Sequence, residues 1–314
     1  MLRMDLGPRE TGSMELSRRR SFHHRDFTAA DLVTLKGGTT ISVCVPAKNE
    51  AATIGGIVQA IRTPLVLEHP LVDEIVVVDD RSTDETGALA AGAGATVVTT
   101  CAPLADVVPA TGKGEALWRG LAASTGELVV YCDADITDFD ARFVLGLVGP
   151  LLTDPSVQFV KGFYERPDTH APGTGGRTTE LVARPLLSLL FPSLTGIVQP
   201  LSGEYAARRA VLEQVPFVQG YGVDLGLLVD VQARWGASAI AQVDLVSRHH
   251  RNRSLDDLSP QALSIMQTAF ARAGWPAERP VTLRRPGLPP LACAHIERPP
   301  LAELREAAAG QASA

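Results

Sequence analysis

Short runs of apolar, mostly β-branched residues alternate with segments of helical spacing through the first half of the chain. Four of these runs predict buried strands, at residues 41–45, 74–78, 96–99 and 127–132. The segments between them predict helices at 51–62, 83–93 and 114–123, and in the first of these Ile54, Ile57, Val58 and Ile61 share one face. Strands that alternate with helices predict βαβ units, so we expect an α/β fold with a mostly parallel sheet flanked by helices.

The flanking regions are less regular. Residues 1–22 are polar and predict a flexible leader without an apolar signal core, and 27–36 predict a short helix capped by Thr28. A Gly- and Pro-containing loop at 167–176 precedes helices predicted at 179–190 and 221–235 and a strand at 239–246. From residue 276 the chain is rich in proline, and 301–309 predict a terminal helix.

Composition narrows the function classes. The chain has 314 residues, a net charge of −6 and 45% hydrophobic residues, which is typical of a globular protein with a substantial core. The mild acidity argues against a nucleic-acid or membrane surface, so an anionic substrate would need a local basic pocket. Four scattered cysteines without metal-ligand spacing favour a reducing, cytoplasmic location, and no apolar stretch is long enough to span a bilayer.

The loops that follow the predicted strands are the expected ligand-binding places, because ligands of open α/β sheets bind beyond the carboxyl ends of the strands. Asp133 and Asp135 lie two residues apart directly after the fourth strand. Two carboxylates in such a turn can hold Mg²⁺ or Mn²⁺ together with a nucleotide diphosphate. The simpler alternative is a turn that uses aspartate for helix capping.

Two further loops close the first and second strands. Residues 46–50 open a helix whose free N–H groups favour a nucleotide, with Asn49 as an alternative helix cap. In the loop at 79–84 we interpret Asp80 as a ligand contact and Ser82 as the cap of the following helix.

Positive charge is expected from two places. Lys113 stands between Gly112 and Gly114 at the start of a predicted helix, where the backbone can approach a phosphate. Residues 248–253 contain three arginines and two histidines in an otherwise acidic protein. Histidine can ligate a metal, and arginine can clamp a phosphate or carboxylate. From the residues alone, a solvent-facing lysine and a solvated basic turn remain the alternatives.

Two candidates are weaker on their own. Arg177 is an anion contact or simply precedes a helix capped by Thr178. Asp224, flanked by Gly222 and Gly226, is a candidate for contacting a sugar or acting as a base. The alternative is an acidic residue that stabilises the N-terminus of a helix.

Taken together, these residues resemble the GT-A glycosyltransferases. More closely, they resemble the retaining glucosyl-3-phosphoglycerate synthases of actinobacteria and the related mannosyl-3-phosphoglycerate synthases. The similarity extends from about Ile41 to Arg253 and rests on residues 45–50, 112–118, 133–135, 179–185, 199–205, 220–224 and 250–253. The first and third segments occur across many GT-A enzymes, whereas the others together are more specific. Asp224 stands where the glucosyl enzymes carry the longer glutamate, and Asp80 where some members carry a smaller polar residue.

The resemblance implies a role for each matched residue. Those around the nucleotide sugar would be Pro46, Ala47, Lys48, Asn49, Glu50, Asp80, Lys113, Asp133, Ala134, Asp135, Tyr221, Asp224, Arg248 and Arg253. Asp135 and His250 would ligate Mg²⁺ or Mn²⁺. Gly176, Arg177, Thr179 and Asn252 would bind 3-phosphoglycerate. Asp224, the Leu201 carbonyl and Lys113 would lie at the reacting centre.

The implied activity is transfer of glucose from UDP-glucose to the 2-hydroxyl of 3-phosphoglycerate with retention, by a homodimer. Use of GDP-mannose, and a sugar-1-phosphate nucleotidyltransferase, stay open as alternatives. The expected organisation is a leader (1–22), a nucleotide-sugar-binding GT-A half (23–165), a smaller acceptor-binding half (166–275) and a Pro-rich C-terminal extension (276–314).

Overall fold

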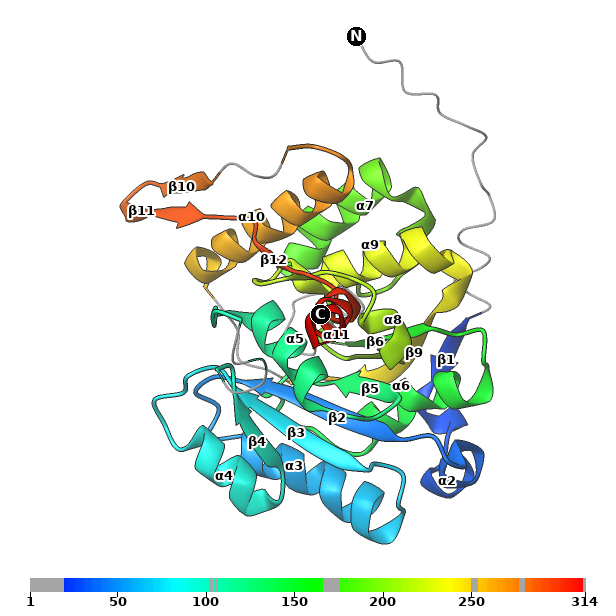
Figure 1. Cartoon of the computed structure of the whole chain (residues 1–314). Coiled ribbons are helices and arrows are strands. Elements are labelled where there is room, and N and C mark those ends of the chain that lie inside the picture. Colours follow the sequence, from blue (N-terminus) through cyan, green and yellow to red (C-terminus); the bar gives the residue numbers. More distant parts are fainter. Residues whose placement is uncertain are drawn as a thin grey trace.

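A central eight-stranded sheet organises the computed structural model, which describes residues 20–101, 104, 107–165, 176–249, 254–276 and 280–312 (Figure 1). The strand order is β1-β9-β6-β7-β5-β2-β3-β4. Only β7 runs antiparallel to its neighbours, so the predicted mostly parallel sheet is confirmed. The strands are β1 (Ser21–His23), β2 (Ile41–Ala47), β3 (Glu74–Asp79), β4 (Thr96–Thr99), β5 (Leu128–Tyr131), β6 (Phe159–Glu165), β7 (Tyr205–Arg208) and β9 (Ile240–Ser247).

Helices cover both faces of the sheet, and each face has its own apolar core. Alternate strand residues point to opposite faces, so Val77 enters one core and Val78 the other, which explains why the strands are apolar throughout. One core holds α2 (Ala29–Lys36), α3 (Ile54–Arg62), α4 (Thr86–Ala93) and α6 (Arg142–Thr153). The other holds α5 (Lys113–Ala123), α7 (Arg184–Leu190), α8 (Arg209–Leu212), α9 (Val223–Trp235) and α10 (Leu255–Arg272).

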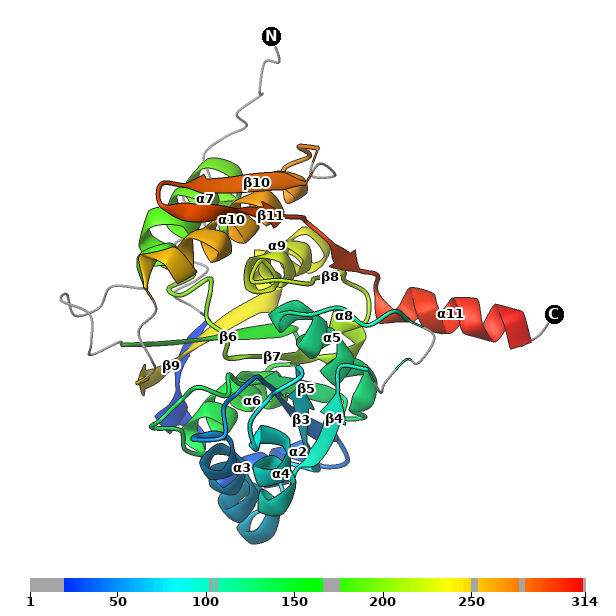
Figure 2. The same cartoon turned by 90° about the vertical axis from the view of Figure 1, so that its left-hand side faces the viewer.

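The remaining elements are short or peripheral. The C-terminal extension contains a hairpin of β10 (Val281–Arg285) and β11 (Leu288–Cys293), then β12 (Glu297–Arg298), which pairs with β8 (Phe217–Val218). The final helix α11 (Leu301–Ala312) projects away from the body (Figure 2). Single turns are η1 (His24–Asp26), η2 (Thr63–Glu68), η3 (Thr179–Ala183), η4 (Pro192–Leu194) and η5 (Ala237–Ala239). Within the described ranges, no helix has the length and apolar character needed to cross a membrane.

Most predicted elements are present, with shifted ends. The strand at 96–99 and the helix cap at Thr28 are confirmed. β2 continues through Pro46, where we predicted its end. Pairing of β2 with β5 ends at Cys44, whose carbonyl accepts from the Cys132 amide. Pro46 faces the same side two residues later, so its missing N–H breaks no strand pairing.

Two helices begin later than predicted. α3 begins at Ile54 and α4 at Thr86, so the preceding residues form loops. The predicted cap at Ser82 is wrong, because the N-cap position of α4 is Glu85. Instead, the Asp84 carboxylate accepts from the Thr86 amide.

Some elements were not predicted at all. They include β6, β7 and α10, and β1, which begins within the expected leader. β6, β7 and β9 belong to the same sheet as β2–β5, so one continuous sheet joins the two expected halves.

Candidate functional site

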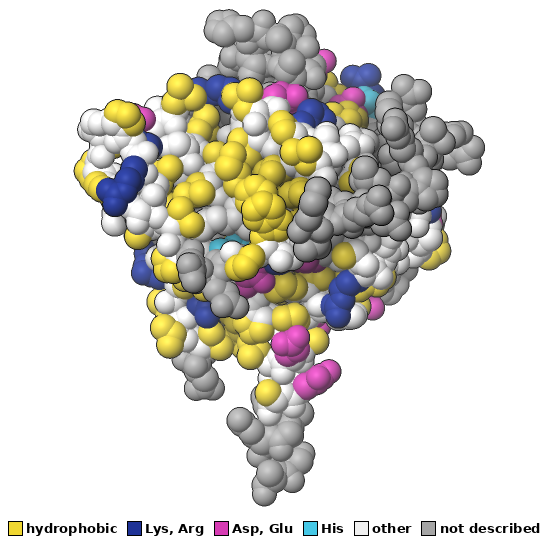
Figure 3. Space-filling view, turned by 90° about the horizontal axis from the view of Figure 1, so that it is seen from above, with side chains coloured by type: hydrophobic (Ala, Val, Ile, Leu, Met, Phe, Trp, Pro, Cys, Tyr) yellow, Lys and Arg dark blue, Asp and Glu magenta, His cyan; other side chains and the backbone are white. Residues whose placement is uncertain are grey.

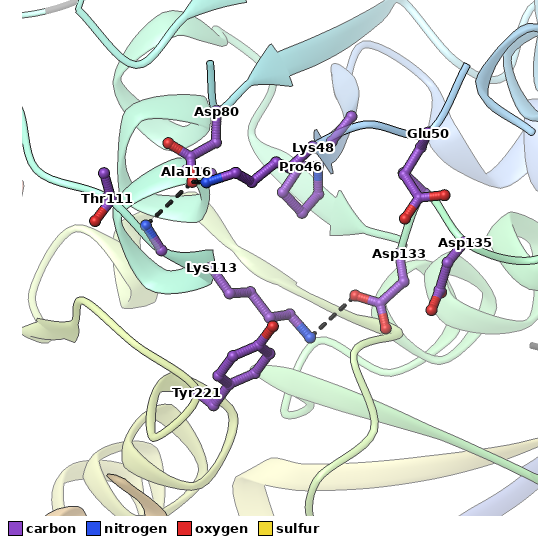
Figure 4. Close-up of a pocket in the computed structure, with 13 residues that line it drawn as sticks. Pro46, Lys48, Glu50, Asp80, Thr111, Lys113, Ala116, Asp133, Asp135 and Tyr221 are labelled. Atoms are coloured by element: carbon purple, nitrogen blue, oxygen red, sulfur yellow. Dashed lines mark hydrogen bonds and ion pairs between the residues drawn. The ribbon is translucent and has the colours of Figure 1, made fainter. Parts of the chain in front are cut away.

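A cavity of about 420 Å³ lies at the carboxyl ends of β2, β3 and β5 (Figure 4). Its volume is in the range of small-molecule sites. The cavity lies at the edge of the sheet where the loops after the strands were expected to bind a ligand. Its lining residues are Pro46, Ala47, Lys48, Glu50, Asp80, Thr111, Gly112, Lys113, Ala116, Asp133, Ala134, Asp135 and Tyr221.

The loops after β2 and β3 are bonded to each other. Asn49 has a positive φ of 56°, a conformation that asparagine tolerates better than most residues. Its amide donates to the Ser82 hydroxyl, and its side-chain oxygen accepts from the Thr83 amide at 2.8 Å. Asn49 therefore fastens the second loop rather than lining the cavity, and it does not cap α3, whose N-cap is Thr53.

One end of the cavity is formed around Asp80, which is buried. One carboxylate oxygen accepts from the Gly112 amide at 3.1 Å, and the ammonium of Lys48 lies 3.9 Å from the same oxygen. The other oxygen has no hydrogen-bond partner among the described residues. Burial raises the pKa of Asp80, against the lowering effect of Gly112 and Lys48. A ligand with an N–H or O–H donor would satisfy the remaining oxygen.

Lys113 points toward the opposite end, where Asp133 and Asp135 lie (Figure 4). Its ammonium contacts Asp133 at 3.0 Å and Asp224 at 3.1 Å. Burial opposes the charge, but the two carboxylates outweigh it and raise the pKa of Lys113. Burial raises the pKa of Asp224 despite Lys113. Lys113 therefore stays charged at neutral pH and is positioned to meet an anion in the cavity.

Arg248 joins this cluster from the end of β9. Its guanidinium donates to Asp133 at 3.0 Å and to Asp135 at 2.6 Å, and it lies 3.3 Å from Glu204. Burial would raise the pKa of Asp133, but Lys113 and Arg248 hold the pKa below its ordinary value. Next to Arg248, the amide of His249 donates to Asp138. The basic turn late in the chain thus faces the aspartates after β5, as far as the described residues extend.

The other predicted residues are placed as follows. Leu201 lies in the turn before Gly203, which packs directly against the Asp133 carboxylate. Gly176, Arg177 and Thr179 do not line the cavity; Thr179 is buried at the start of η3, and Thr178 makes no side-chain cap there. His250, Asn252 and Arg253 lie outside the described residues.

Three residues of the cluster were not predicted. Glu204 is buried beside Arg248, and burial raises its pKa. Lys161 is buried on β6, its ammonium 4.5 Å from the ring centre of Tyr205 and 3.4 Å from the Asp224 carbonyl. Tyr164 accepts from Arg248 at 2.7 Å. The sequence signal for Lys161 was its position as a charged residue within an otherwise apolar run.

The residues at the acidic end suit a divalent ion that also binds phosphate. Mg²⁺ and Mn²⁺ prefer oxygen ligands and commonly use one or two carboxylates plus substrate phosphates. Asp133 and Asp135 both reach the cavity, with about a fifth of each side chain exposed, 21% and 20%. No cluster of three His, Cys, Asp or Glu side chains forms an ion site within the part of the chain that the structure describes. Phosphate oxygens of a bound ligand would add to the carboxylate oxygens as ligands.

The sequence is similar to those of known glycosyltransferases. The model of the family "Glycosyl transferase family 2" matches residues 42–215. The glucosyl-3-phosphoglycerate synthase of Mycolicibacterium smegmatis is 49% identical over 258 residues, which cover 81% of this chain and 84% of that protein.

Solved structures agree with the sequence comparison. The glucosyl-3-phosphoglycerate synthase of Mycobacterium tuberculosis in complex with Mn²⁺, UDP-glucose and phosphoglyceric acid is similar with a TM-score of 0.83 and 44% identity, over 91% of this chain and 98% of that chain. The same enzyme in complex with Mn²⁺, UDP and glucosyl-3-phosphoglycerate is similar with a TM-score of 0.81, 44% identity, and coverage of 91% of this chain and 99% of that chain.

Proposed function

The chain belongs to glycosyl transferase family 2, and from this premise we propose that it transfers glucose from UDP-glucose to the 2-hydroxyl of 3-phosphoglycerate, with retention. The observation that carries the proposal is the cavity in which Lys113, Asp133 and Asp135 meet at the carboxyl edge of the sheet. Glucosyl-3-phosphoglycerate synthases are among the relatives that are 44% to 49% identical over most of the chain. The solved relatives hold UDP-glucose, phosphoglyceric acid and Mn²⁺, which supports this donor, acceptor and metal.

The two ends of the cavity fit the two parts of the donor. Asp80, with its unsatisfied oxygen, would accept from the uridine, and the loop at 46–50 would enclose it. Lys113 would bind the diphosphate, because it is charged, only 13% exposed and turned toward the acidic end. Asp135 and His250 would hold the divalent ion, which when bound supplies positive charge to the leaving diphosphate.

Lys113 has to exchange partners when the donor binds. Its present partners, Asp133 and Asp224, are both carboxylates, and a diphosphate offers a stronger anion at the same place. Asp224 would then face the sugar, with the charge of Lys161, which bonds to the Asp224 carbonyl, nearby to offset that of its carboxylate. Tyr221, Arg248 and Arg253 would complete the donor site. The protein therefore acts mainly through positioning and electrostatics, with no covalent step required.

The acceptor site is proposed beside the sugar, on the face from which the diphosphate leaves. Arg177, Thr179 and Asn252, with the backbone of Gly176, would bind the carboxylate and phosphate of 3-phosphoglycerate. The Leu201 carbonyl would lie near the anomeric carbon, since its turn packs on Asp133 through Gly203. An acceptor hydroxyl held on the face that the diphosphate leaves would give retention.

A substrate matrix tests this function. UDP-glucose and GDP-mannose are each incubated with 3-phosphoglycerate or glycerate, with and without Mn²⁺, and the products are identified by NMR. We expect UDP release only with UDP-glucose, 3-phosphoglycerate and the ion together, and an α-linked product. Release of GDP from GDP-mannose at an equal or higher rate would instead assign the mannosyl activity.

The metal role is tested by Asp135→Ala. We expect loss of ion-dependent turnover, by about 100-fold or more, because an oxygen ligand at the leaving diphosphate is removed. The matched control is Asp140→Ala, which removes an aspartate from the same β5–α6 connection outside the cavity. Wild-type turnover by Asp135→Ala would contradict the metal assignment.

We also propose that the protein works in the cytoplasm as a homodimer. All four cysteines have free thiols, which supports a reducing compartment. Seen from above, hydrophobic side chains gather over the α7–α10 end of the molecule (Figure 3). Exposed apolar residues of this region include Leu181 of η3, Leu189 of α7 and Leu255 of α10. Light scattering after size exclusion tests the dimer, and a monomer at micromolar concentration would contradict it.

A further inference from the structure

The Pro-rich extension, which has no role in the proposed reaction, contacts the elements that build the donor site. β12 pairs with β8, and the Gln219 amide donates to the Ile296 carbonyl at 2.9 Å. The indole of Trp118 on α5 donates to the Pro299 carbonyl at 3.0 Å. We refer to residues 296–299 as the C-terminal brace.

Arg298 is the centre of the brace. Its guanidinium donates to both carboxylate oxygens of Glu115, at 2.5 Å and 2.9 Å, and to the Val108 carbonyl at 2.6 Å. It also lies 5.3 Å from the ring centre of Trp118. Glu115 is fully buried on the first turn of α5 and also accepts from Arg119 and from the Ala110 amide. Arg298 thus joins the start of α5 to the loop that precedes it.

That loop and helix start carry the groups that face the donor. Thr111, Gly112 and Lys113 line the cavity. The Gly112 amide donates to Asp80, and Lys113 reaches Asp133. Both ends of the proposed donor site therefore depend on where residues 108–115 lie.

The brace also fixes the second helix at the site. Glu297 pairs with Arg272 of α10, and Arg272 forms two bonds with Asp230 of α9. The start of α9 carries Asp224, which meets Lys113. Between the two helix starts, the Glu115 amide donates to the Gln219 carbonyl, and a side chain at Gly114 would collide with the Val218 carbonyl at 1.7 Å. α5 and β8 are packed so closely here that neither can move without the other.

We propose that the C-terminal brace is a positioning element of the donor site, and that Arg298 holds residues 108–115 in the place where Lys113 and Gly112 can meet a nucleotide diphosphate. This inference rests on the proposed function, which identifies the nucleotide diphosphate as the ligand. It acts through Glu115 and the backbone, and Arg298 itself touches no substrate. The C-terminal extension then contributes to donor binding by positioning these residues.

The test compares Arg298→Met with wild type. A shift of Lys113 by part of an ångström should raise the KM for UDP-glucose and the dissociation constant of UDP with Mn²⁺ by about tenfold. The KM for 3-phosphoglycerate should stay within about twofold, since the brace acts on residues 108–115, which carry groups that face the donor. The matched control is Arg305→Met, which removes an arginine of the same extension that pairs with Glu213 away from the cavity.

A second variant separates positioning from stability. Arg298→Met leaves the buried Glu115 short of a partner, so the double variant Arg298→Met/Glu115→Gln removes that charge as well. If the double variant unfolds at the wild-type temperature and still binds UDP weakly, the brace positions the donor site. If it regains both wild-type stability and wild-type KM, Arg298 is only structural and the proposal is wrong. Wild-type donor affinity in Arg298→Met would overturn it too.

The UDP-binding measurement keeps the two proposals apart. A wild-type protein that binds UDP but forms no product with 3-phosphoglycerate would refute the proposed function. The effect of Arg298→Met on UDP binding would still decide the inference about the brace.

Discussion

Gly203→Ala is the sharpest test of the acidic end of the site. Gly203 has no positive φ, so alanine fits its backbone. The difficulty is space, because a methyl group there would lie 2.3 Å and 2.4 Å from the two carboxylate oxygens of Asp133. Ordinary contacts between carbon and oxygen are about 3.4 Å, so the carboxylate has to move by about 1 Å.

Movement of the Asp133 carboxylate changes its contacts with both of its partners. Its oxygens lie 3.0 Å from Lys113 and 3.0 Å from Arg248, so a shift of this size lengthens or breaks both contacts. A misplacement of 1 Å at an active site can lower a rate by about 100-fold. Crowding in a well-packed region also costs about 1–3 kcal/mol of unfolding free energy. We therefore expect kcat/KM for UDP-glucose to fall by about two orders of magnitude.

Initial rates at saturating 3-phosphoglycerate, with Mn²⁺ titrated, measure the effect. Gly92→Ala is the control, because Gly92 is an exposed helix position where a methyl group meets nothing within 4 Å. That variant should keep its rate and gain about 0.5–1 kcal/mol of stability. Folded Gly203→Ala with kcat/KM within about threefold of wild type would refute the placement of Asp133 at the reacting end.

Two further predictions concern stability. Burial lowers the pKa of Lys161 to about 8 from its ordinary 10.5, so between these values the unfolded chain binds a proton that the folded chain lacks. Stability should therefore rise with pH in this window by up to a few kcal/mol relative to Lys161→Met, measured by urea unfolding; parallel pH curves would contradict this. Ser254→Ala removes the hydroxyl that accepts from the Asp257 amide at the start of α10 and should cost about 1 kcal/mol. An unchanged thermal midpoint by circular dichroism would show that this cap contributes nothing.

The sequence predicted the first half of the fold well because its strands are buried on both faces. Such strands appear as uninterrupted apolar runs, and their partners lie close along the chain. β6 was missed because Lys161 interrupts its run, and the groups that stabilise the buried ammonium come from distant segments. No local pattern contains that information.

α10 was missed for a comparable reason. Pro260 lies inside it and cannot bond to the Asp256 carbonyl one turn earlier. That carbonyl instead accepts from Arg285 of β10 at 2.7 Å. The compensation comes from a hairpin that follows the helix, so it is visible only in the folded chain.

The functional site was likewise predicted only in part. Residues that follow strands, such as Asp80 and Asp133, were predicted to reach a ligand and do line the cavity. Glu204 was not assigned a role, because its burial depends on an arginine from the far end of β9. Spacing along the chain indicates which loops meet, but not which buried charges balance one another.

The position of β1 has a consequence for how the chain reaches this structure. Among the described strands β1 pairs with β9 alone, and the Gln242 side chain that bonds to Ser21 lies 221 residues away in sequence. During synthesis, the first strand to leave the ribosome must wait for one of the last, while β2, β3, β4 and β5 can already assemble. Docking of β1 is therefore a late event in folding, and the unpaired edge of β9 is exposed until it occurs.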